Sequence, residues 1–247
     1  DGYLVFTTLE TGVASPIDLA GLVAGQGRQT EGETEILIGG GLMMIAELEP
    51  GFIQVVDPLS FASVGAAYRA GEDLSDVVID RDGTVWMMTT SGTLRELDWV
   101  ADSGTFSVSL ERPVTGAGPQ TQLVPHSSGV TVFAPDGGAV LQIGVGADYV
   151  QQVPALQGPV LAADRSPSDL SPASATDAGL VVMISGRQLV QVDVGGIGCA
   201  RPLKPAVLED RVYVPCGGQG VVLVLDAQGR QHGEPIQVPG GGDPNLV

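Results

Sequence analysis

The chain has 247 residues, of which 36 are glycine and 17 are proline, and 43% of its residues are hydrophobic. Because glycine and proline interrupt helices, this composition excludes a long helical bundle, while the hydrophobic content excludes a disordered chain. The 29 acidic and 11 basic residues give a net charge of −18, so nucleic acid binding, which needs basic side chains, is also excluded. The composition predicts an acidic, β-rich domain.

One type of strand recurs along the chain: alternating apolar residues that end in Asp or an equivalent residue. The six copies are Tyr3–Thr8, Phe52–Asp57, Thr93–Asp98, Ala139–Gly144, Gln188–Asp193 and Val221–Asp226. Their ends are about 44 residues apart on average. An apolar second strand precedes each of the last five copies, at Leu42–Ala46, Thr84–Met88, Val130–Ala134, Leu180–Ile184 and Arg211–Pro215.

A further strand precedes these pairs, usually after a glycine-rich stretch. These strands are Glu35–Ile38, Asp76–Asp80, Thr121–Val124, Pro159–Ala162, Pro205–Leu208 and, at the end of the chain, Pro244–Val247. A more polar fourth strand closes the repeat, as in Thr105–Leu110, Tyr149–Val153 and Pro235–Val238. Turns such as Asp82-Gly83 join the strands, because glycine readily adopts the positive φ that tight turns require.

Four antiparallel strands in a repeat of about 40–50 residues are typical of a propeller blade. A single four-stranded sheet cannot bury both faces, whereas radial stacking of sheets buries both. A β-sandwich has similar turn spacing but no such repeat. We therefore predict an all-β fold, a six-bladed β-propeller of four-stranded antiparallel blades that forms one domain over residues 1–247. Its units are residues 1–20 plus 239–247, 21–66, 67–112, 113–154, 155–202 and 203–238.

The strand count also predicts how the ring closes. The chain supplies six innermost strands and six strands in the third position, but five in the second position. The incomplete blade must therefore combine Pro244–Val247 with Tyr3–Thr8, so that the ring closes by pairing of N- and C-terminal strands. We expect the missing strand to come from a flanking segment or, by strand exchange, from a neighbouring chain.

Two stretches resemble known propeller repeats. Residues 82–98 (DGTVWMMTTSGTLRELD) are similar to the NHL-type blade, and residues 219–247 (QGVVLVLDAQGRQHGEPIQVPGGGDPNLV) are similar to YVTN-type blades. The resemblance is to extracytoplasmic propellers of membrane-anchored or secreted actinobacterial proteins, some of which carry fibronectin type III modules. A single lysine, Lys204, and a single asparagine, Asn245, agree with a high-GC bacterial source. No stretch is long and apolar enough to span a membrane, so membrane attachment is expected only through segments outside this chain.

The two cysteines, Cys199 and Cys216, flank the hairpin expected from Pro205–Leu208 and Arg211–Pro215. Partner numbers in an antiparallel pair have a constant sum, and pairing Cys199 with Cys216 centres the turn close to the expected one at Leu208–Asp210. Both sulfur atoms then lie at the same end of the hairpin. We predict a disulfide that closes 18 residues, contributes roughly 3 kcal/mol and forms in an oxidising compartment. The alternative is a pair of buried free thiols.

Other candidate sites are weaker. His126 and His232 lie in polar turn contexts without a supporting motif, so both are expected at the surface. The acidic stretch Glu72–Asp76 and Asp80–Gly83 lacks ligands that a calcium loop needs, and a solvated turn is expected there. Gly195–Gly198 is expected to be a turn, because the Cys-Ala-Arg-Pro that follows cannot continue the helix of a dinucleotide loop. We assign no catalytic, cofactor-binding or metal-binding residue and expect no cofactor.

The expected function is an extracytoplasmic binding or scaffold module whose rigid propeller surface faces a protein, peptide or glycan partner. Two alternatives stay open: a propeller enzyme, a lyase or hydrolase acting at the central channel, and a ligand-free spacer of a cell-surface protein. Converging Asp, Arg and His side chains at one channel mouth would favour the enzyme, and a broad apolar patch across loop tips would favour binding. The Ser- and Pro-rich residues 163–177 are expected to form a long loop in the fifth unit, with a composition that suits O-glycosylation.

Overall fold

A computed structural model describes residues 3–7, 14–18, 34–59, 62–126, 129–134, 139–144, 149–152, 159–163, 170–185 and 188–238. Every element in these residues is a β-strand, and the strands form five four-stranded sheets and one two-stranded sheet. Within this described part of the chain, no helix is long and apolar enough to cross a membrane.

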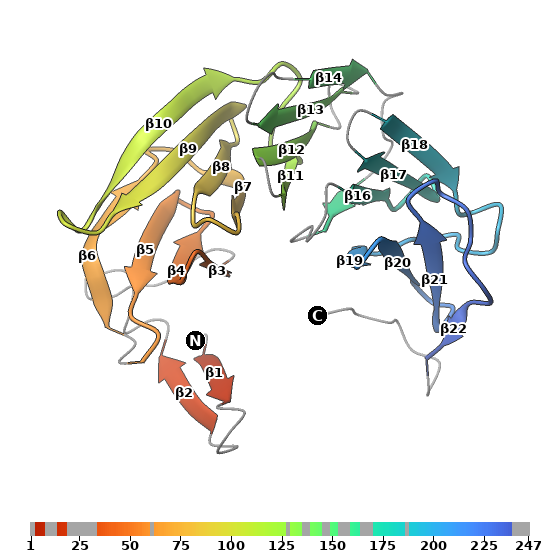
Figure 1. Ribbon diagram of the computed structural model, residues 1–247, viewed down its shortest axis with the longest axis horizontal. Coiled ribbons are helices and arrows are strands. Elements are labelled where there is room, and N and C mark those ends of the chain that lie inside the picture. The colour runs from red at the N-terminus through yellow and green to blue at the C-terminus, as the bar shows by residue number, and fades with distance from the viewer. Residues whose placement is uncertain are drawn as a thin grey trace.

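Each four-stranded sheet is an antiparallel meander of strands that are consecutive in the chain. The sheets are β3–β6 (Thr34–Gly39, Leu42–Glu47, Phe52–Val56, Ser63–Arg69), β7–β10 (Leu74–Ile79, Val85–Thr89, Thr93–Val100, Thr105–Pro113), β11–β14 (Gln122–His126, Gly129–Ala134, Ala139–Gly144, Tyr149–Gln152), β15–β18 (Val160–Ala162, Leu170–Ala175, Leu180–Ser185, Gln188–Asp193) and β19–β22 (Ala206–Leu208, Arg211–Cys216, Val221–Asp226, Ile236–Gln237). The sheets lie side by side around a common centre, and the first strands of neighbouring sheets lie nearest to it (Figure 1). This arrangement confirms the predicted all-β propeller with four-stranded antiparallel blades.

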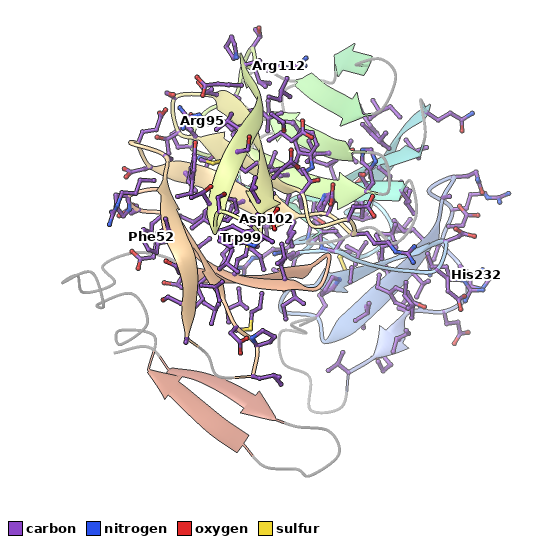
Figure 2. The ribbon with its side chains drawn as sticks, turned by 60° about the vertical axis from the view of Figure 1, so that its left-hand side comes forward. Phe52, Arg95, Trp99, Asp102, Arg112 and His232 are labelled. Carbon is purple, nitrogen blue, oxygen red and sulfur yellow. A yellow bond between two sulfur atoms is a disulfide. The ribbon has the colours of Figure 1, made fainter. Side chains whose placement is uncertain are left out.

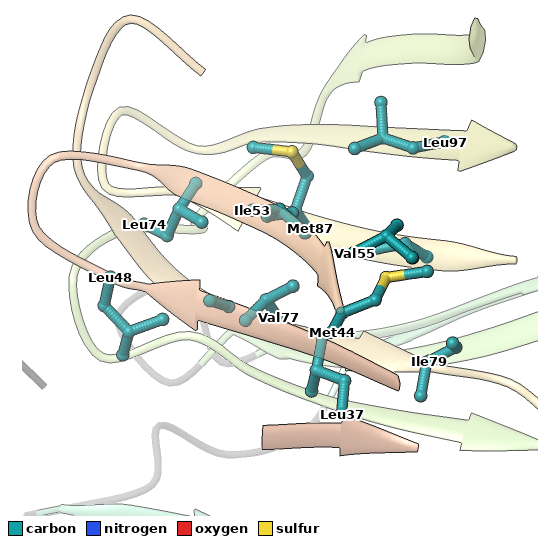
Figure 3. Close-up of a cluster of buried hydrophobic side chains, with 12 residues drawn as sticks. Leu37, Met44, Leu48, Ile53, Val55, Leu74, Val77, Ile79, Met87 and Leu97 are labelled. Atoms are coloured by element: carbon teal, nitrogen blue, oxygen red, sulfur yellow. The ribbon is translucent and has the colours of Figure 1, made fainter. Parts of the chain in front are cut away.

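Neighbouring blades pack face to face through apolar side chains. Between the first two four-stranded sheets, Met44 and Ile53 of one sheet pack in a common cluster with Val77 and Met87 of the other, and all four are fully buried (Figure 3). Side chains alternate between the two faces of a strand, yet every residue of β5 and β8 is buried, because each of these sheets is covered on both faces. Burying one such side chain contributes roughly 1.5–3 kcal/mol.

The β15–β18 sheet corrects one prediction. The sequence predicts a loop at residues 163–177, but Leu170–Ala175 forms β16, which pairs with β15 on one side and with β17 on the other. Consequently Leu180–Ser185 is the third strand of this blade and Gln188–Asp193 the fourth, whereas the sequence predicts them as the second and third.

Small buried side chains explain why β16 is a strand despite its loop-like composition. Ser171 and Ser174 are fully buried, and Thr131 of the preceding blade donates a hydrogen bond from Oγ1 to the Ser171 hydroxyl oxygen (3.0 Å). Pro172 has no N–H to donate, and its backbone nitrogen faces the end of the short strand β15. The pairing is kept there by one hydrogen bond, which Ala163 N–H donates to the Pro172 carbonyl (3.1 Å). Contacts with the neighbouring blade and strands therefore override the local composition.

At the N-terminus, β1 (Tyr3–Thr7) pairs with β2 (Ala14–Asp18) in a two-stranded sheet near the β3–β6 end of the arc (Figure 1). The sequence does not predict β2, because Pro16 interrupts its pattern, and it predicts Pro244–Val247 as a strand of the same blade. Residues 239–247 lie outside the described residues, so pairing between the two termini stays a prediction. The described residues hold five complete four-stranded blades and the β1–β2 hairpin, and the sixth blade, which the sequence predicts to be incomplete, depends on residues outside the described ones.

The β9–β10 hairpin links two blades at the outer margin of the propeller. Phe106 lies edge to face with Trp99 of the same hairpin (ring centroids 5.0 Å apart) and with Tyr68 of the neighbouring strand β6 (6.1 Å); Figure 2 shows Trp99 on this hairpin. Gly65 of β6 has a positive φ, and a Cβ atom there would overlap the carbonyl oxygen of Gly104 at the hairpin tip. The close approach of the two backbones therefore requires glycine at this position.

Candidate functional site

A hollow of about 640 Å³ lies where the innermost strands meet, and we call it the channel hollow. It is lined by residues of β3, β7, β11 and β15 and by a residue that precedes β19: Glu35, Ile36, Leu37, Ile38, Asp76, Val77, Val78, Ile79, Gln122, Leu123, Ala162 and Lys204. Because all five complete blades contribute to its wall, the hollow is a product of the assembled ring and not of any one repeat.

Four polar side chains from four blades line the channel hollow: Glu35, Asp76, Gln122 and Lys204. Each lies near the beginning of the first strand of its blade. Glu35 is the second residue of β3, Asp76 the third of β7 and Gln122 the first of β11, and Lys204 lies two residues before β19. The repeated topology therefore brings corresponding positions of four blades together.

The carboxyl group of Asp76 is held by the backbone of two blades. Its Oδ1 atom accepts a hydrogen bond from Val77 N–H (2.8 Å), and its Oδ2 atom accepts one from Leu123 N–H of the next blade (2.6 Å). The residue is only 7% exposed. These bonds join β7 to β11 and keep the carboxyl group in one place at the hollow.

Burial raises the pKa of Asp76 well above its ordinary value, and the negative charge of Glu35 raises it further. The two backbone N–H donors and the positive charge of Lys204 act in the opposite direction without reversing the shift. Asp76 is therefore a buried acid at the hollow whose protonation depends on its surroundings.

The remaining wall of the channel hollow is aliphatic. Ile38 lies on an innermost strand and is nevertheless 56% exposed, and Ile36, Val78 and Ala162 line the hollow with it. A concave site that combines apolar residues with a few convergent polar groups is typical of ligand-binding sites.

Cys199 and Cys216 form a disulfide, as the sequence predicts, and neither is a free thiol. The strand register on which that prediction was based is wrong, because Cys216 lies opposite Pro202 and not opposite Cys199. Cys199 instead ends a turn in which its N–H donates to the carbonyl of Val194 (2.8 Å), and the disulfide joins this turn to the end of β20.

The disulfide closes the segment that carries Lys204. Two backbone hydrogen bonds hold the residues between Cys199 and Lys204. Leu203 N–H donates to the Pro215 carbonyl (2.8 Å), and Gly217 N–H donates to the Arg201 carbonyl (2.8 Å). The segment before Lys204 is thus fixed to β20 by backbone hydrogen bonds as well as by the disulfide, which places the ammonium group at the hollow.

The two histidines lie outside the channel hollow. His232 is exposed on the β19–β22 sheet, as predicted (Figure 2). His126 is 8% exposed, although the sequence predicts a surface position, because it ends the innermost strand β11 and is covered by neighbouring residues.

Two of the remaining turn predictions are confirmed and one is wrong. Asp80 forms the predicted turn, since its Oδ1 atom accepts hydrogen bonds from Asp82 N–H (3.0 Å) and Thr84 N–H (2.9 Å), but Asp76 is buried in β7 and is not part of a solvated turn. Gly195–Gly198 forms the predicted turn. Across the residues that the structure describes, no group of three or more His, Cys, Asp or Glu side chains could hold a metal ion.

The sequence matches no protein-family model and no curated protein sequence. Among solved structures, the chain is similar to virginiamycin B lyase from Staphylococcus aureus, with a TM-score of 0.69 and 11% identity over 96% of this chain and 78% of the lyase chain. It is also similar to the WD40 repeats of RRP9 (TM-score 0.63, 12% identity, 96% and 74% of the two chains). A third similar structure is the β-propeller domain of Cps50 (Swd1) from Myceliophteria thermophila (TM-score 0.55, 13% identity, 86% and 72%). At these identities the similarity shows the fold alone, which is that of a β-propeller.

Sequence reasoning missed all four polar residues of the channel hollow. A signal was present, because Glu35, Asp76, Gln122 and Lys204 are polar residues at the beginning of otherwise apolar innermost strands. The signal becomes visible only when the innermost strands are aligned with one another, since each residue taken alone is an ordinary polar residue at the end of a loop.

Proposed function

We propose that this chain is an extracytoplasmic binding module that takes its ligand at the channel hollow. The observation that carries the proposal is the convergence of Glu35, Asp76, Gln122 and Lys204, from four blades, on a cavity with an aliphatic wall. Its volume of about 640 Å³ falls within the range of about 300–1,000 Å³ that is usual for ligand pockets. The polar groups would fix the orientation of a ligand, and the aliphatic wall would supply affinity.

The partner class that we propose is a protein, peptide or glycan that presents a side chain or an end group to the hollow. The similarity to WD40 propellers supports a scaffold role of this kind. The net charge of −18 supports a partner that is not itself strongly acidic, because like charges repel during encounter.

The extracytoplasmic location rests on the disulfide. Bonds such as Cys199–Cys216 persist in oxidising compartments and are rare where thiols are kept reduced. The proposed location is also supported by a sequence resemblance. Residues 82–98 and 219–247 resemble NHL-type and YVTN-type blades of actinobacterial cell-surface proteins.

We also propose that residues 1–247 form one domain with six blades. The sixth blade would combine the β1–β2 hairpin with the strand predicted at Pro244–Val247, which closes the ring between its two ends. A flanking segment or a neighbouring chain would supply the missing strand. Closure of this kind removes exposed strand edges, which otherwise offer unpaired backbone groups to other chains.

A second candidate function is catalysis in the same hollow, as a lyase or hydrolase. The observation that favours it is the raised pKa of Asp76 beside the carboxyl group of Glu35, because a protonated and an ionised carboxyl group can act as general acid and base. The similarity to virginiamycin B lyase supports it further, since that structure is a lyase with a related fold. In this alternative Asp76→Asn abolishes turnover and leaves ligand binding measurable.

The binding proposal is tested by blocking the channel hollow. A fragment library that contains cationic, neutral and anionic compounds is screened for binding to the wild type, to Ile38→Trp and to Ile236→Trp. Ile38 lines the hollow and is 56% exposed, and Ile236 is 49% exposed on β22, so the second variant is a matched control for the surface change. We expect fragments that bind the wild type and Ile236→Trp but not Ile38→Trp. Binding that Ile38→Trp leaves unchanged, or no binding in any charge class, overturns the proposal and favours the ligand-free spacer.

A further inference from the structure

We propose that the outer edge of β10 binds an extended segment of a partner protein in which aliphatic and basic side chains alternate. The segment would pair with Thr105–Val108, the part of β10 next to the hairpin tip, which we call the β10 edge. The β10 edge lies at the outer margin of the propeller (Figure 1), whereas the channel hollow lies at its centre. The two sites are therefore tested independently of each other.

Strand β10 can accept a further strand. It is nine residues long, and among the described residues it is the longest strand and pairs on one side only, with β9. Unpaired backbone N–H and C=O groups at such an edge can pair with an extended peptide, which is a common mode of recognition. The hairpin is also held in place, because Ala66 N–H donates to the Gly104 carbonyl at its tip (2.7 Å). The ring of Phe106 packs edge to face against Trp99 and Tyr68. A partner would therefore bind a preformed edge, which reduces the entropy cost of binding.

The rest of β10 has features that protect it from pairing, and the β10 edge lacks them. A bulge follows Val108 and interrupts the register with β9. Beyond the bulge, Arg95 Nε donates to Glu111 Oε2 (2.8 Å), and Pro113 has no N–H to donate. Bulges, charged side chains and proline keep edge strands from pairing with other chains. Thr105–Val108 has no proline and no charge, and it holds the β-branched and aromatic residues that favour strands.

One side of the β10 edge is apolar. Phe106 packs against the core cluster between the first two four-stranded sheets, and Val108 lies opposite Leu97 of that cluster. Both side chains are therefore on the side of the sheet that faces β3–β6, and Val108 is 44% exposed. Val64 of β6 lies opposite Val55 of the same cluster and is also exposed. An aliphatic side chain on this side of an added strand would cover Val108 and remove apolar surface from water.

The other side of the β10 edge is acidic. Ser107 lies opposite Asp98, which is exposed, and Glu96 is on the same side of β9 as Asp98 because the two are two residues apart. Burial and the negative charge of Asp98 raise the pKa of Glu96, so the two carboxyl groups repel each other. Residues 96–110 contain three acidic residues and no Lys or Arg. A basic side chain on this side of an added strand would therefore approach negative charge.

The two sides of the β10 edge favour a basic partner segment over a second copy of this chain. Pairing of two such edges would bring the acidic hairpins of both copies together, with Asp98 and Asp102 on each, and every copy carries a net charge of −18. Because side chains alternate between the faces of a strand, a segment with alternating aliphatic and basic residues matches both sides at once. An acidic segment or a wholly polar one matches at most one side.

Three capped octapeptides test the partner class: one of alternating lysine and valine, one of alternating glutamate and valine, and one of alternating lysine and serine. Binding to the wild-type protein is followed through the backbone amide resonances of Thr105–Val108, with Ile236 on the outermost strand β22 as the control. We expect the lysine–valine peptide to shift the β10 edge and to bind about threefold or more tightly than the other two. Its affinity is expected to fall as the salt concentration rises.

Four outcomes would overturn the proposal. Equal binding of the three peptides, or preference for one of the other two, contradicts the partner class. The absence of any shift at Thr105–Val108 contradicts the site. Shifts confined to Ile36 and Ile38 contradict it too, because they place the peptide in the channel hollow. Self-association of the wild type that Val108→Lys abolishes identifies a second copy of the chain as the occupant.

Two variants test the two sides of the β10 edge. Val108→Lys removes aliphatic surface and adds a positive charge, so it is expected to weaken binding of the lysine–valine peptide about fivefold or more. Asp98→Asn removes one negative charge and is expected to weaken that binding about two- to fivefold. Ile236→Lys and Asp210→Asn place the same new side chains at exposed positions outside β10 and are expected to leave binding unchanged. Dispersed amide spectra establish that each variant is folded. Equal binding to Val108→Lys and Ile236→Lys overturns the proposal.

Discussion

Asp76→Asn is expected to destabilise the propeller, because it removes a hydrogen-bond acceptor that two blades share. In the wild type the two carboxyl oxygens accept N–H bonds from Val77 (2.8 Å) and from Leu123 (2.6 Å). The amide has a single oxygen, so its NH₂ group must face one of these two donors. Leaving a buried N–H unpaired costs about 1–3 kcal/mol. For a domain of this size, that loss lowers the melting temperature by about 2–12 °C.

The size of this deficit is expected to depend on pH. Because burial raises the pKa of Asp76 above its ordinary value of 3.8, the folded state binds this proton more tightly than the unfolded state. The stabilising effect of the bound proton is complete below the unfolded pKa and is lost as the pH rises toward the folded pKa. Asn has no such dependence, so the deficit of the variant is largest in acid and shrinks as the pH rises.

Urea denaturation of both proteins between about pH 4 and about pH 8 measures the free energy of unfolding and therefore this difference. Asp102→Asn, at an exposed hairpin position, is the control and is expected to follow the wild-type curve. A deficit that grows as the pH rises would show that the ionised carboxylate stabilises the fold, and it would refute the reasoning about burial.

Three further predictions concern the scaffold. Reduction of the Cys199–Cys216 disulfide, whose cysteines are 17 positions apart, is expected to cost about 3 kcal/mol and to lower the melting temperature by about 6–12 °C in calorimetry; an unchanged transition would contradict it. Gly65→Ala is expected to destabilise the protein by about 1–3 kcal/mol more than Gly71→Ala in urea, because both glycines have positive φ but a Cβ at Gly71 meets no atom within 4 Å. Equal losses would show that the two blades do not pack closely there. His232→Ala, at an exposed position, is expected to stay within about 0.5 kcal/mol of the wild type, and a larger loss would reveal a buried role.

Individual strands could be predicted from the sequence where their pattern is local. Val221–Asp226 is observed as β21 with the predicted bounds. A run of apolar residues between two turns indicates a buried strand without information from other parts of the chain. Gln188–Asp193 also has the predicted bounds, yet its place in the blade is wrong because β16 was missed. The burial of Ser171 and Ser174 depends on a neighbouring blade, and no local pattern reports that contact.

The channel hollow could not be predicted for a related reason. Its residues come from five blades that are far apart in the sequence, and their convergence depends on how the innermost strands lie around the centre. Asp76 is the clearest case in which the predicted and the observed environment differ. Its acidic neighbours in the sequence suggest a solvated turn, whereas the strand in which it lies is buried. The disulfide could be predicted, because the chain has two cysteines and both flank one predicted hairpin. The strand register predicted for that hairpin was nevertheless shifted, since Cys216 lies opposite Pro202.

The central claim, that the channel hollow is a ligand site, is tested most directly by intermolecular nuclear Overhauser effects between a fragment that binds the wild type and the methyl groups of the protein. We expect contacts from the bound fragment to the methyl groups of Ile36 and Ile38, which line the hollow. Contacts only to the exposed methyl groups of Ile197 and Ile236, outside the hollow, would contradict it.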